Sequence, residues 1–564
     1  MKWVALVTVI AVGLVQLPSP VVRIRSGLLR GTLGTNGRFY QFLGVPYGTV
    51  DDRNRFQAPL PPPTWDGVYD AINENTWCPQ RFQGSIITIG QPDCLKLNIY
   101  APTTAKPDSP IPVMVFIHGG CFFEGVGSRF LYSGEYFTDH GVIFVGINYR
   151  LNIEGFLCLG IQQAPGNAGL KDQIAALKWI KENIKSFGGD PDNVTLFGES
   201  AGAVSTSLLL LSPLAKGLFH KAILQSGSSV VPWGIQHDPI RTASSLVKEF
   251  GYNTKDPYEL YDIISKKSHD ELIRAIKYVK SKTWITADNL FVPCIEKELD
   301  GIEPIISRFP LDVIESSNYT KVPLIVGYND MEGLFFVSKD FGTSLKEADA
   351  RELIKRDLLF PNKLERDVVA EQIQRHYFSV SKKDLVFDMV NLYSDLHFKF
   401  PSVIESELYA KNAEHPIYYY LFKYGGAMNI PKFISLFFGA GGAAHADELF
   451  YMMRPFILPT PQRATEHVMM ERMLTFDPTP KTSEILPLKW EPSREWNPRA
   501  LVIDEHLTTA PLWHMPSIRL WNETYSKYRR KDYGFKVKNG GDCLTETCVG
   551  RRTNSSTSFK LSNP

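Results

Sequence analysis

Apolar and polar residues follow two patterns along this chain. Short, almost wholly apolar runs predict buried strands, and between them apolar residues return every three or four positions, which predicts amphipathic helices. Residues 170–187 form one such expected helix, with Ile174, Leu177 and Ile180 near helical spacing. The expected strands are 97–100, 113–117, 142–149, 194–197, 221–225, 322–326, 417–422 and 500–503. Buried strands that alternate with helices predict an α/β fold, with a large, mostly parallel sheet and helices on both faces.

The regions beside this alternating pattern differ from it. Residues 21–31 and 38–45 alternate enough to predict an N-terminal antiparallel pair. Residues 340–412 are dominated by helical patterns, such as 345–358 and 364–378, and are expected to leave the sheet. Since no internal repeat and no linker-like stretch divides the sequence, we expect residues 19–532 to form a single domain.

The N-terminus predicts secretion. A lysine at position 2 precedes an almost wholly apolar run at 4–15, which Pro18 and Pro20 end, so residues 1–18 are expected to be a signal peptide. No later run is long and apolar enough to predict a membrane span. The tail 533–564 is rich in Gly, Asn, Ser, Thr and Lys, which predicts disorder and gives no lipid-anchor signal.

Composition excludes some partners and directs attention to the cysteines. With 44% hydrophobic and 21% charged residues, the 564-residue chain is typical of globular proteins, and its net charge of +1 argues against a nucleic-acid partner. Secretion would allow disulfides among the seven cysteines. Cys78 and Cys94 bracket a loop that they could close, Cys543 and Cys548 could pair in the tail, and Cys121, Cys158 and Cys294 are expected to stay as buried thiols.

Four sequons are present, at Asn193, Asn318, Asn522 and Asn554. Asn193 abuts the expected buried strand 194–197, so we expect it to carry no glycan. The other three are predicted glycosylation sites.

The segment Gly198-Glu199-Ser200-Ala201-Gly202 fits the G-x-S-x-G pattern of a nucleophile elbow. An expected buried strand precedes it and a helical pattern follows it, which is the context that the motif requires. The flanking glycines would be needed because a Cβ at either position would clash with the neighbouring strand or helix. Ser200 is therefore the candidate nucleophile.

A serine nucleophile needs a base and an acid that orients the base, and in this kind of site they follow in the order Ser, acid, His. The loop after the expected strand 322–326 offers two acids, Asp330 and Glu332. Two later histidines are serious candidates for the base. His445 lies in a glycine-rich loop after the expected strand 417–422, whereas His506 follows the last expected strand. The pattern favours His445 and leaves His506 open.

Several further motifs complete a resemblance. They are Asp93-Cys94-Leu95, Asn148-Tyr149-Arg150, Gly166-Asn167-Ala168-Gly169-Leu170-Lys171-Asp172-Gln173, Phe187-Gly188-Gly189-Asp190-Pro191 and Leu224-Gln225-Ser226-Gly227. Together with the elbow they resemble the type-B carboxylesterase and cholinesterase family from about residue 20 to about residue 530, and most of all the secreted esterases of insects. The resemblance implies the α/β-hydrolase fold, ester hydrolysis through an acyl-enzyme, the triad Ser200, Glu332 and His445, and a disulfide between Cys78 and Cys94.

The resemblance also implies roles for neighbouring residues. The backbone N–H groups of Gly120, Cys121 and Ala201 would form the oxyanion hole. Position 121 is usually glycine in the family, so here a side chain would enter the pocket. Glu199 would add negative potential near His445, and Ser226 would support the site from behind. The positions that line the substrate gorge in the family hold Phe122, Phe123, Trp233, Phe335 and Phe336.

The implied substrate is a small-molecule ester, with no metal and no cofactor. Cholinesterases hold their cationic substrate on a tryptophan in the loop that Cys78 and Cys94 close here, and this loop has none. A neutral, apolar ester is therefore expected, for example an odorant or a xenobiotic. A juvenile-hormone esterase is an alternative, although those enzymes usually carry Gln where Glu199 stands. A non-catalytic protein that binds apolar ligands is a second alternative. The sequence does not predict the oligomeric state.

Overall fold

The computed structural model describes residues 20–81, 85, 87–279, 291–338, 350–354, 357–378, 385–437, 439–455, 488, 490–493, 498–512 and 515–531. The predicted signal segment, the tail with Cys543, Cys548 and Asn554, and half of the predicted helix 345–358 lie outside these residues.

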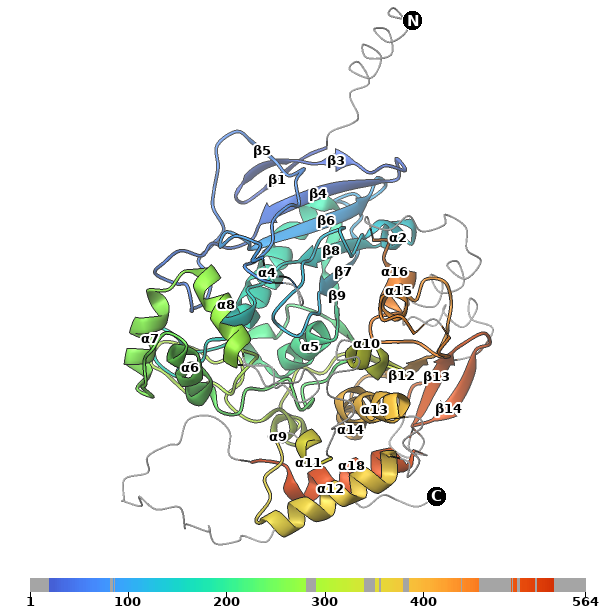
Figure 1. The fold of residues 1–564 in the computed structure, drawn as a ribbon. Helices are drawn as coiled ribbons and strands as arrows, with labels where there is room; N and C mark the ends of the chain where they lie inside the picture. Colours follow the sequence, from blue (N-terminus) through green and yellow to red (C-terminus); the bar gives the residue numbers. More distant parts are fainter. Residues whose placement is uncertain are drawn as a thin grey trace, which may run out of the picture.

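An 11-stranded sheet runs through the described part of the chain, in the order β14-β13-β12-β11-β10-β9-β7-β8-β6-β4-β3 (Figure 1). Its strands are β3 (Thr32–Leu33), β4 (Phe39–Pro46), β6 (Lys96–Pro102), β7 (Ile111–Ile117), β8 (Ile143–Ile147), β9 (Gly189–Glu199), β10 (Lys221–Gln225), β11 (Leu324–Asn329), β12 (Ile417–Phe422), β13 (Arg499–Ile503) and β14 (Thr508–Pro511). All neighbours from β8 to β13 pair in parallel, and only the strands at the two edges pair antiparallel. The predicted α/β architecture with a mostly parallel sheet is confirmed.

Side chains of the central strands alternate between two buried clusters. In β7, Val113, Val115 and Ile117 enter one cluster, whereas Met114 and Phe116 enter the other. The first cluster includes residues of α4 (Ala168–Asn183) and α5 (Ala201–Leu211), and the second includes residues of α2 (Glu135–Asp139) and α16 (Leu449–Met452). Helices therefore cover both faces of the sheet, which is why its strands are apolar on both sides.

Most of the remaining helices lie in the second half of the chain and beside the sheet (Figure 1). They are α3 (Asn152–Phe156), α6 (Pro239–Lys248), α7 (Pro257–Ser265), α8 (His269–Val279), α9 (Pro310–Glu315), α10 (Gly333–Ser338), α11 (Ala350–Leu353), α12 (Lys363–Tyr377), α13 (Leu385–Ser394), a π-helical turn (Asp395–Lys399), α14 (Phe400–Lys411), α15 (Ile430–Ile434) and α18 (Pro516–Tyr528). The chain thus leaves the sheet between β11 and β12, as predicted, and the expected helix 364–378 corresponds to α12. No helix among the described residues is long and apolar enough to cross a bilayer.

The predicted N-terminal antiparallel pair is wrong in its partners. Residues 21–31 fold back on themselves as the hairpin of β1 (Val21–Ile24) and β2 (Gly27–Arg30), in a small sheet with β5 (Val68–Asp70). Strand β4 pairs instead with β6 and β3 in the large sheet. Alternation predicts a strand but does not identify its partner, so this error is of the expected kind.

Two disulfides are formed. The predicted bond between Cys78 and Cys94 is present, over a sequence separation of 16. Cys158 and Cys294 form a second bond over a separation of 136, so the expectation that they stay as thiols is wrong. Their apolar surroundings were correctly predicted, but the fold brings the two sulfur atoms together. Of the described cysteines, Cys121 alone keeps its thiol.

The structure also separates the predicted glycosylation sites. Asn318 is exposed after α9. Asn522 lies within α18 with only 8% of its surface exposed, so the glycan expected there stays a prediction that this burial disfavours. Asn193 accepts a hydrogen bond from the Lys221 ammonium at 2.6 Å, which is in keeping with an unmodified side chain.

Candidate active site

Ser200 occupies the turn between β9 and α5 and has a strained backbone, with φ 57° and ψ −123°. The turn can be this tight only because its flanking residues lack a Cβ. A Cβ on Gly198 would lie 2.4 Å from the backbone of Gly202, and a Cβ on Gly202 would lie 1.9 Å from the carbonyl oxygen of Ile117. The Ser200 N–H donates to the carbonyl oxygen of Gln225 on the neighbouring strand. This is the geometry expected of a nucleophile elbow.

Glu332 and His445 lie together at the carboxyl ends of β11 and β12. The Nδ1 of His445 is 2.6 Å from Oε2 of Glu332, and both side chains are buried. The other oxygen of Glu332 accepts hydrogen bonds from the Ser226 hydroxyl at 2.5 Å and from the Asn329 N–H at 2.8 Å. This carboxylate is therefore held on both sides and can fix the tautomer and orientation of the imidazole. Ser226 thus supports the site through the carboxylate of Glu332, in keeping with the supporting role expected from the sequence.

Glu199 reaches the opposite side of the same imidazole. Its Oε1 lies 3.0 Å from Nε2 of His445. Burial raises the pKa of Glu199 well above its usual range, and the neighbouring charge of Glu332 raises it further. Among the described residues, His445 and Ser200 form no hydrogen bond with each other. Contacts between a nucleophile and its base often tighten only when substrate binds.

A third buried glutamate, Glu448, completes a cluster of carboxyl groups with Glu199 and Glu332. Its Oε2 accepts a hydrogen bond from the Asn329 side chain at 2.6 Å. Burial and then repulsion from Glu199 and Glu332 raise its pKa well above its usual range. No motif marks Glu448 in the sequence, although it stands three residues after His445. In the described part of the chain, no group of three or more His, Cys, Asp or Glu side chains is arranged to hold a metal ion.

The glycine-rich turn after β7 lies directly against the elbow. A Cβ on Gly119 would be 2.7 Å from a carboxylate oxygen of Glu199 and 3.0 Å from Cβ of Ser200. The next two residues, Gly120 and Cys121, have positive φ angles of 105° and 55°. Ala201 is the first residue of α5, so its N–H belongs to the positive end of that helix. The three predicted oxyanion donors are thus brought to the two sides of Ser200.

Aromatic rings surround the imidazole. The ring centroids of Phe336 and Phe335 are 5.0 Å and 6.1 Å from that of His445. A ring that the sequence analysis missed, Phe398, is the nearest of the three at 4.7 Å. Phe398 also lies 6.2 Å from Trp233, which joins that residue to the same wall. The π-helical turn that holds Phe398 has no clear sequence signal, and such turns are frequent at functional sites.

The remaining predicted pocket residues, Phe122 and Phe123, differ in their burial. Phe123 is only partly buried. Phe122 is 0% exposed and its ring packs edge-on against Phe156 at 5.0 Å. It belongs to the core of the protein, so its prediction as a pocket residue is corrected. The backbone at Phe122 has a positive φ of 66°.

The competing acid and base are placed elsewhere. His506 is exposed in the turn between β13 and β14, outside the contacts of Glu332. Asp330 accepts a hydrogen bond from the Ala443 N–H at 2.8 Å, and therefore shapes the loop before His445. Glu332 and His445 are the acid and imidazole that the fold brings to Ser200.

Comparisons with known proteins show what the chain is similar to. The family model described as "Carboxylesterase family" matches residues 18–508. Rat bile salt-activated lipase is 32% identical over 501 residues, which cover 84% of this chain and 78% of the lipase. Mouse neuroligin-2 is 33% identical over 487 residues, or 77% of this chain, and the match spans only 56% of the neuroligin.

Among solved structures, juvenile hormone esterase from Manduca sexta, with OTFP covalently attached, is similar. The two chains superpose with a TM-score of 0.80 and 28% sequence identity, over 90% of this chain and 100% of the other. Since the family model spans most of the sequence and the α/β-hydrolase fold agrees, the chain belongs to the carboxylesterase family.

Proposed function

We propose that this protein is a secreted serine carboxylesterase that hydrolyses neutral, apolar carboxylic esters through an acyl-enzyme. One observation supports the proposal above all others. The Glu332–His445 pair, at 2.6 Å, is held beside a serine at a strained strand-to-helix turn. A protein that only binds ligands has no need for either the strain or the oriented imidazole.

In the proposed reaction, the Ser200 hydroxyl attacks the ester carbonyl carbon while His445 accepts its proton. The carbonyl oxygen becomes an oxyanion, which the N–H groups of Gly120, Cys121 and Ala201 would stabilise by about 3 kcal/mol each. The oxyanion collapses, the bond to the alcohol oxygen breaks, and His445 returns the proton to that oxygen. Water then attacks the acyl-enzyme by the same route, which releases the acid and restores Ser200.

Glu332 stabilises the imidazolium that forms in each step. Glu199 lies 3.0 Å from the nitrogen that must exchange the proton. Because burial raises the pKa of Glu199, this carboxyl group holds its proton more strongly than an exposed glutamate would. We infer that it tunes the base and does not replace it.

An apolar substrate is favoured by the rings beside His445. Phe335, Phe336, Phe398 and Trp233 offer hydrophobic surface and no charge. The likeness to a juvenile hormone esterase favours a second candidate, an esterase of juvenile-hormone type. Glu199 argues mildly against it, for the reason given above. The name of neuroligin-2 states no hydrolysis, so a non-catalytic, apolar-ligand-binding role is the third candidate.

The test is steady-state hydrolysis of a series of 4-nitrophenyl esters of increasing chain length by the purified protein. Ser200→Ala, His445→Ala and Glu332→Gln should each lower kcat/KM by roughly 10⁴-fold or more while the thermal midpoint is retained. His506→Ala is the matched control and should leave turnover unchanged. Turnover that survives Ser200→Ala, or that His506→Ala abolishes, would overturn the assignment. A wild-type protein that shows no turnover would favour the binding role.

A further inference from the structure

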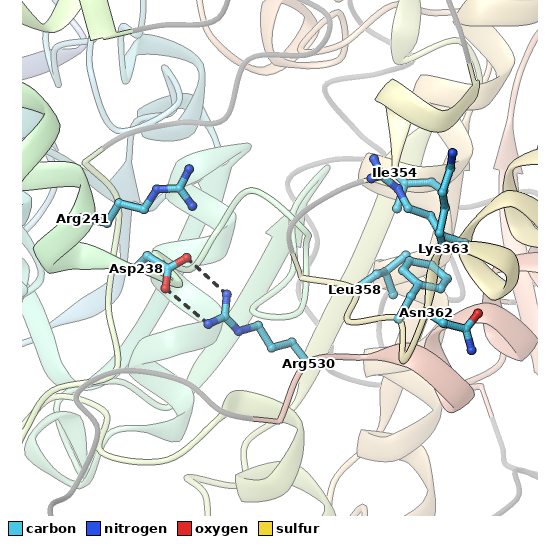
Figure 2. A pocket seen from close by; sticks show the side chains of 9 residues that line it. Asp238, Arg241, Ile354, Leu358, Asn362, Lys363 and Arg530 are labelled. Carbon is cyan, nitrogen blue, oxygen red and sulfur yellow. Dashed lines mark hydrogen bonds and ion pairs between the residues drawn. The ribbon is translucent and has the colours of Figure 1, made fainter. Parts of the chain in front are cut away.

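A cavity of about 510 Å³ lies away from the site described above, between the start of α6, the start of α12 and the chain just after α18. Its volume is in the range of pockets that hold small organic molecules. Figure 2 shows that its walls come from chain segments far apart in sequence, with Asp238 and Arg241 on one side and Lys363 and Asn362 on the other. The fold, and no single helix end, creates this cavity.

Its walls carry a surplus of positive charge. Four cationic side chains, Arg241, Lys363, Arg366 and Arg530, line the cavity together with one carboxylate, that of Asp238. The guanidinium of Arg530 reaches across to Asp238, with both of its N–O distances at 3.3 Å (Figure 2). This one ion pair leaves the other three cations without compensation inside the cavity.

The cations at the rim are available to a ligand. Arg241 and Lys363 are exposed, and neither forms an ion pair with a carboxylate among the described residues. Arg366 donates one hydrogen bond to the carbonyl oxygen of Arg351 at 2.9 Å, which fixes its guanidinium at the cavity wall. Exposed like charges on one rim repel each other, so a bound anion would relieve that repulsion.

Beneath this rim the lining is apolar. Ile354, Leu358 and Phe360 form it, and Leu358 is 7% exposed. The ring of Phe360 is fixed against Tyr528 of α18, with the two centroids 4.5 Å apart. An inorganic anion could contact only the cations at the rim and would leave the apolar lining uncovered. A nucleic acid would need a longer series of basic side chains than these three.

We propose that this cavity binds an amphipathic organic anion, with a carboxylate, sulfate or sulfonate head and an alkyl or aryl body. The head pairs with Arg241 and competes with Asp238 for Arg530, since guanidinium groups bind such heads in a forked arrangement, and Lys363 adds positive potential from the other side of the cavity. The body lies on Ile354, Leu358 and Phe360. The proposal does not depend on the esterase function, although the acid released from an apolar ester belongs to the same class of ligand.

The test measures the binding of octane-1-sulfonate to the full-length protein by isothermal titration calorimetry, below the micelle concentration of the probe. The probe has no ester bond, so hydrolysis cannot disturb the result. Arg241→Gln combined with Lys363→Gln should weaken saturable binding by about 10-fold or more. Binding of the probe near Ser200 would be the same in all these variants, because neither residue touches that site.

Two controls make the result decisive. Lys248→Gln removes an exposed cation from the other end of α6 and should leave the affinity unchanged. Octan-1-ol has the alkyl body of the probe without its charge, and sodium sulfate has a charged head without the alkyl body. Both should bind at least about 10-fold more weakly than octane-1-sulfonate.

Equal affinity of wild type and the double variant for octane-1-sulfonate would overturn the site. Equal affinity for sulfate and octane-1-sulfonate would overturn the amphipathic ligand. Since both substituted residues are exposed, unchanged circular dichroism is expected and would be checked first.

Discussion

Among single residues, the buried glutamates Glu332, Glu199 and Glu448 have the most consequences. Glu332 is held by Ser226 and Asn329, Glu199 touches the far side of the imidazole, and Glu448 is held by Asn329. Burial and the charge of Glu332 raise the pKa of Glu199, and burial with repulsion from both neighbours raises that of Glu448, so both groups hold a proton more strongly in the folded protein than in the unfolded chain.

This arrangement predicts the pH dependence of stability. A carboxyl group whose pKa is raised by folding makes the folded state less stable as the pH rises above the usual carboxyl range, because the unfolded state gives up its proton more easily. Glu448→Gln keeps an acceptor for Asn329 and removes the ionisable group. We expect the thermal midpoint of this variant to fall less than that of wild type between about pH 5 and about pH 8. Glu523→Gln, an exposed change on α18, is the control; parallel curves for wild type and Glu448→Gln would contradict the prediction.

Cys121 leads to a second prediction at this scale. Its thiol is partly buried and its N–H is a proposed oxyanion donor, so its side chain must lie at the wall of the substrate pocket. A methylthio group added by methyl methanethiosulfonate should block turnover in wild type, because small displacements in an active site cost large factors in rate. Cys121→Gly suits the φ of 55° and should be resistant. Equal inhibition, or equal resistance, of the two proteins would show that the thiol is not in the pocket.

The local pattern identified the elbow and narrowed the acid to Asp330 or Glu332 and the imidazole to His445 or His506, because these residues follow buried strands; the family resemblance then selected Glu332 and His445. The pattern missed Phe398 and Glu448, since their positions depend on helix packing and not on a motif. Phe122 was misplaced for the same reason. The direction of a side chain in a turn with positive φ is not visible in a pattern of residue types.

At the scale of elements, the apolar runs predicted the central strands well because parallel strands are buried on both faces. Partners at the edges were harder to predict, as β1, β2 and β4 show. The same limit applies to the bond between Cys158 and Cys294, since local periodicity has no information about residues 136 positions apart. That bond lies beside a network in which Asn167 both donates to and accepts from the backbone of Cys294.

The two disulfides should differ in their effect on stability. On loop-entropy grounds, a bond over a separation of 136 stabilises by about 5 kcal/mol, and one over 16 by about 3 kcal/mol. Cys158→Ala with Cys294→Ala should therefore lower the free energy of unfolding more than Cys78→Ala with Cys94→Ala. Denaturant titration of the two double variants measures the difference. A larger loss for the short loop would mean that local contacts, and not chain entropy, dominate.

At the scale of the whole molecule, the outer surface decides which sequons can be modified. Asn318 is exposed, whereas Asn522 is 8% exposed within α18 and Asn193 is bonded to Lys221. If the protein is secreted as proposed, glycopeptide mapping of protein from a eukaryotic host should find a glycan at Asn318 and none at Asn193 or Asn522. A glycan at Asn522 would mean that modification precedes the docking of α18. A protein that is secreted with Asn318 bare would contradict the assignment.

The order of strands in the sheet has a consequence for biosynthesis. Ser200, Glu332 and His445 follow β9, β11 and β12, and β12 takes its place only when it pairs with β11 after the long helical excursion. When the ribosome has completed β11 and the loop with Glu332, the chain contains the nucleophile and the acid but not the base. The edge of β11 that pairs with β12 in the folded protein is then still unpaired. Pairings between such distant segments form slowly and leave unpaired edges open to aggregation. Nascent chains of this protein should depend on chaperones until β12 emerges, and chains truncated before it should be catalytically silent.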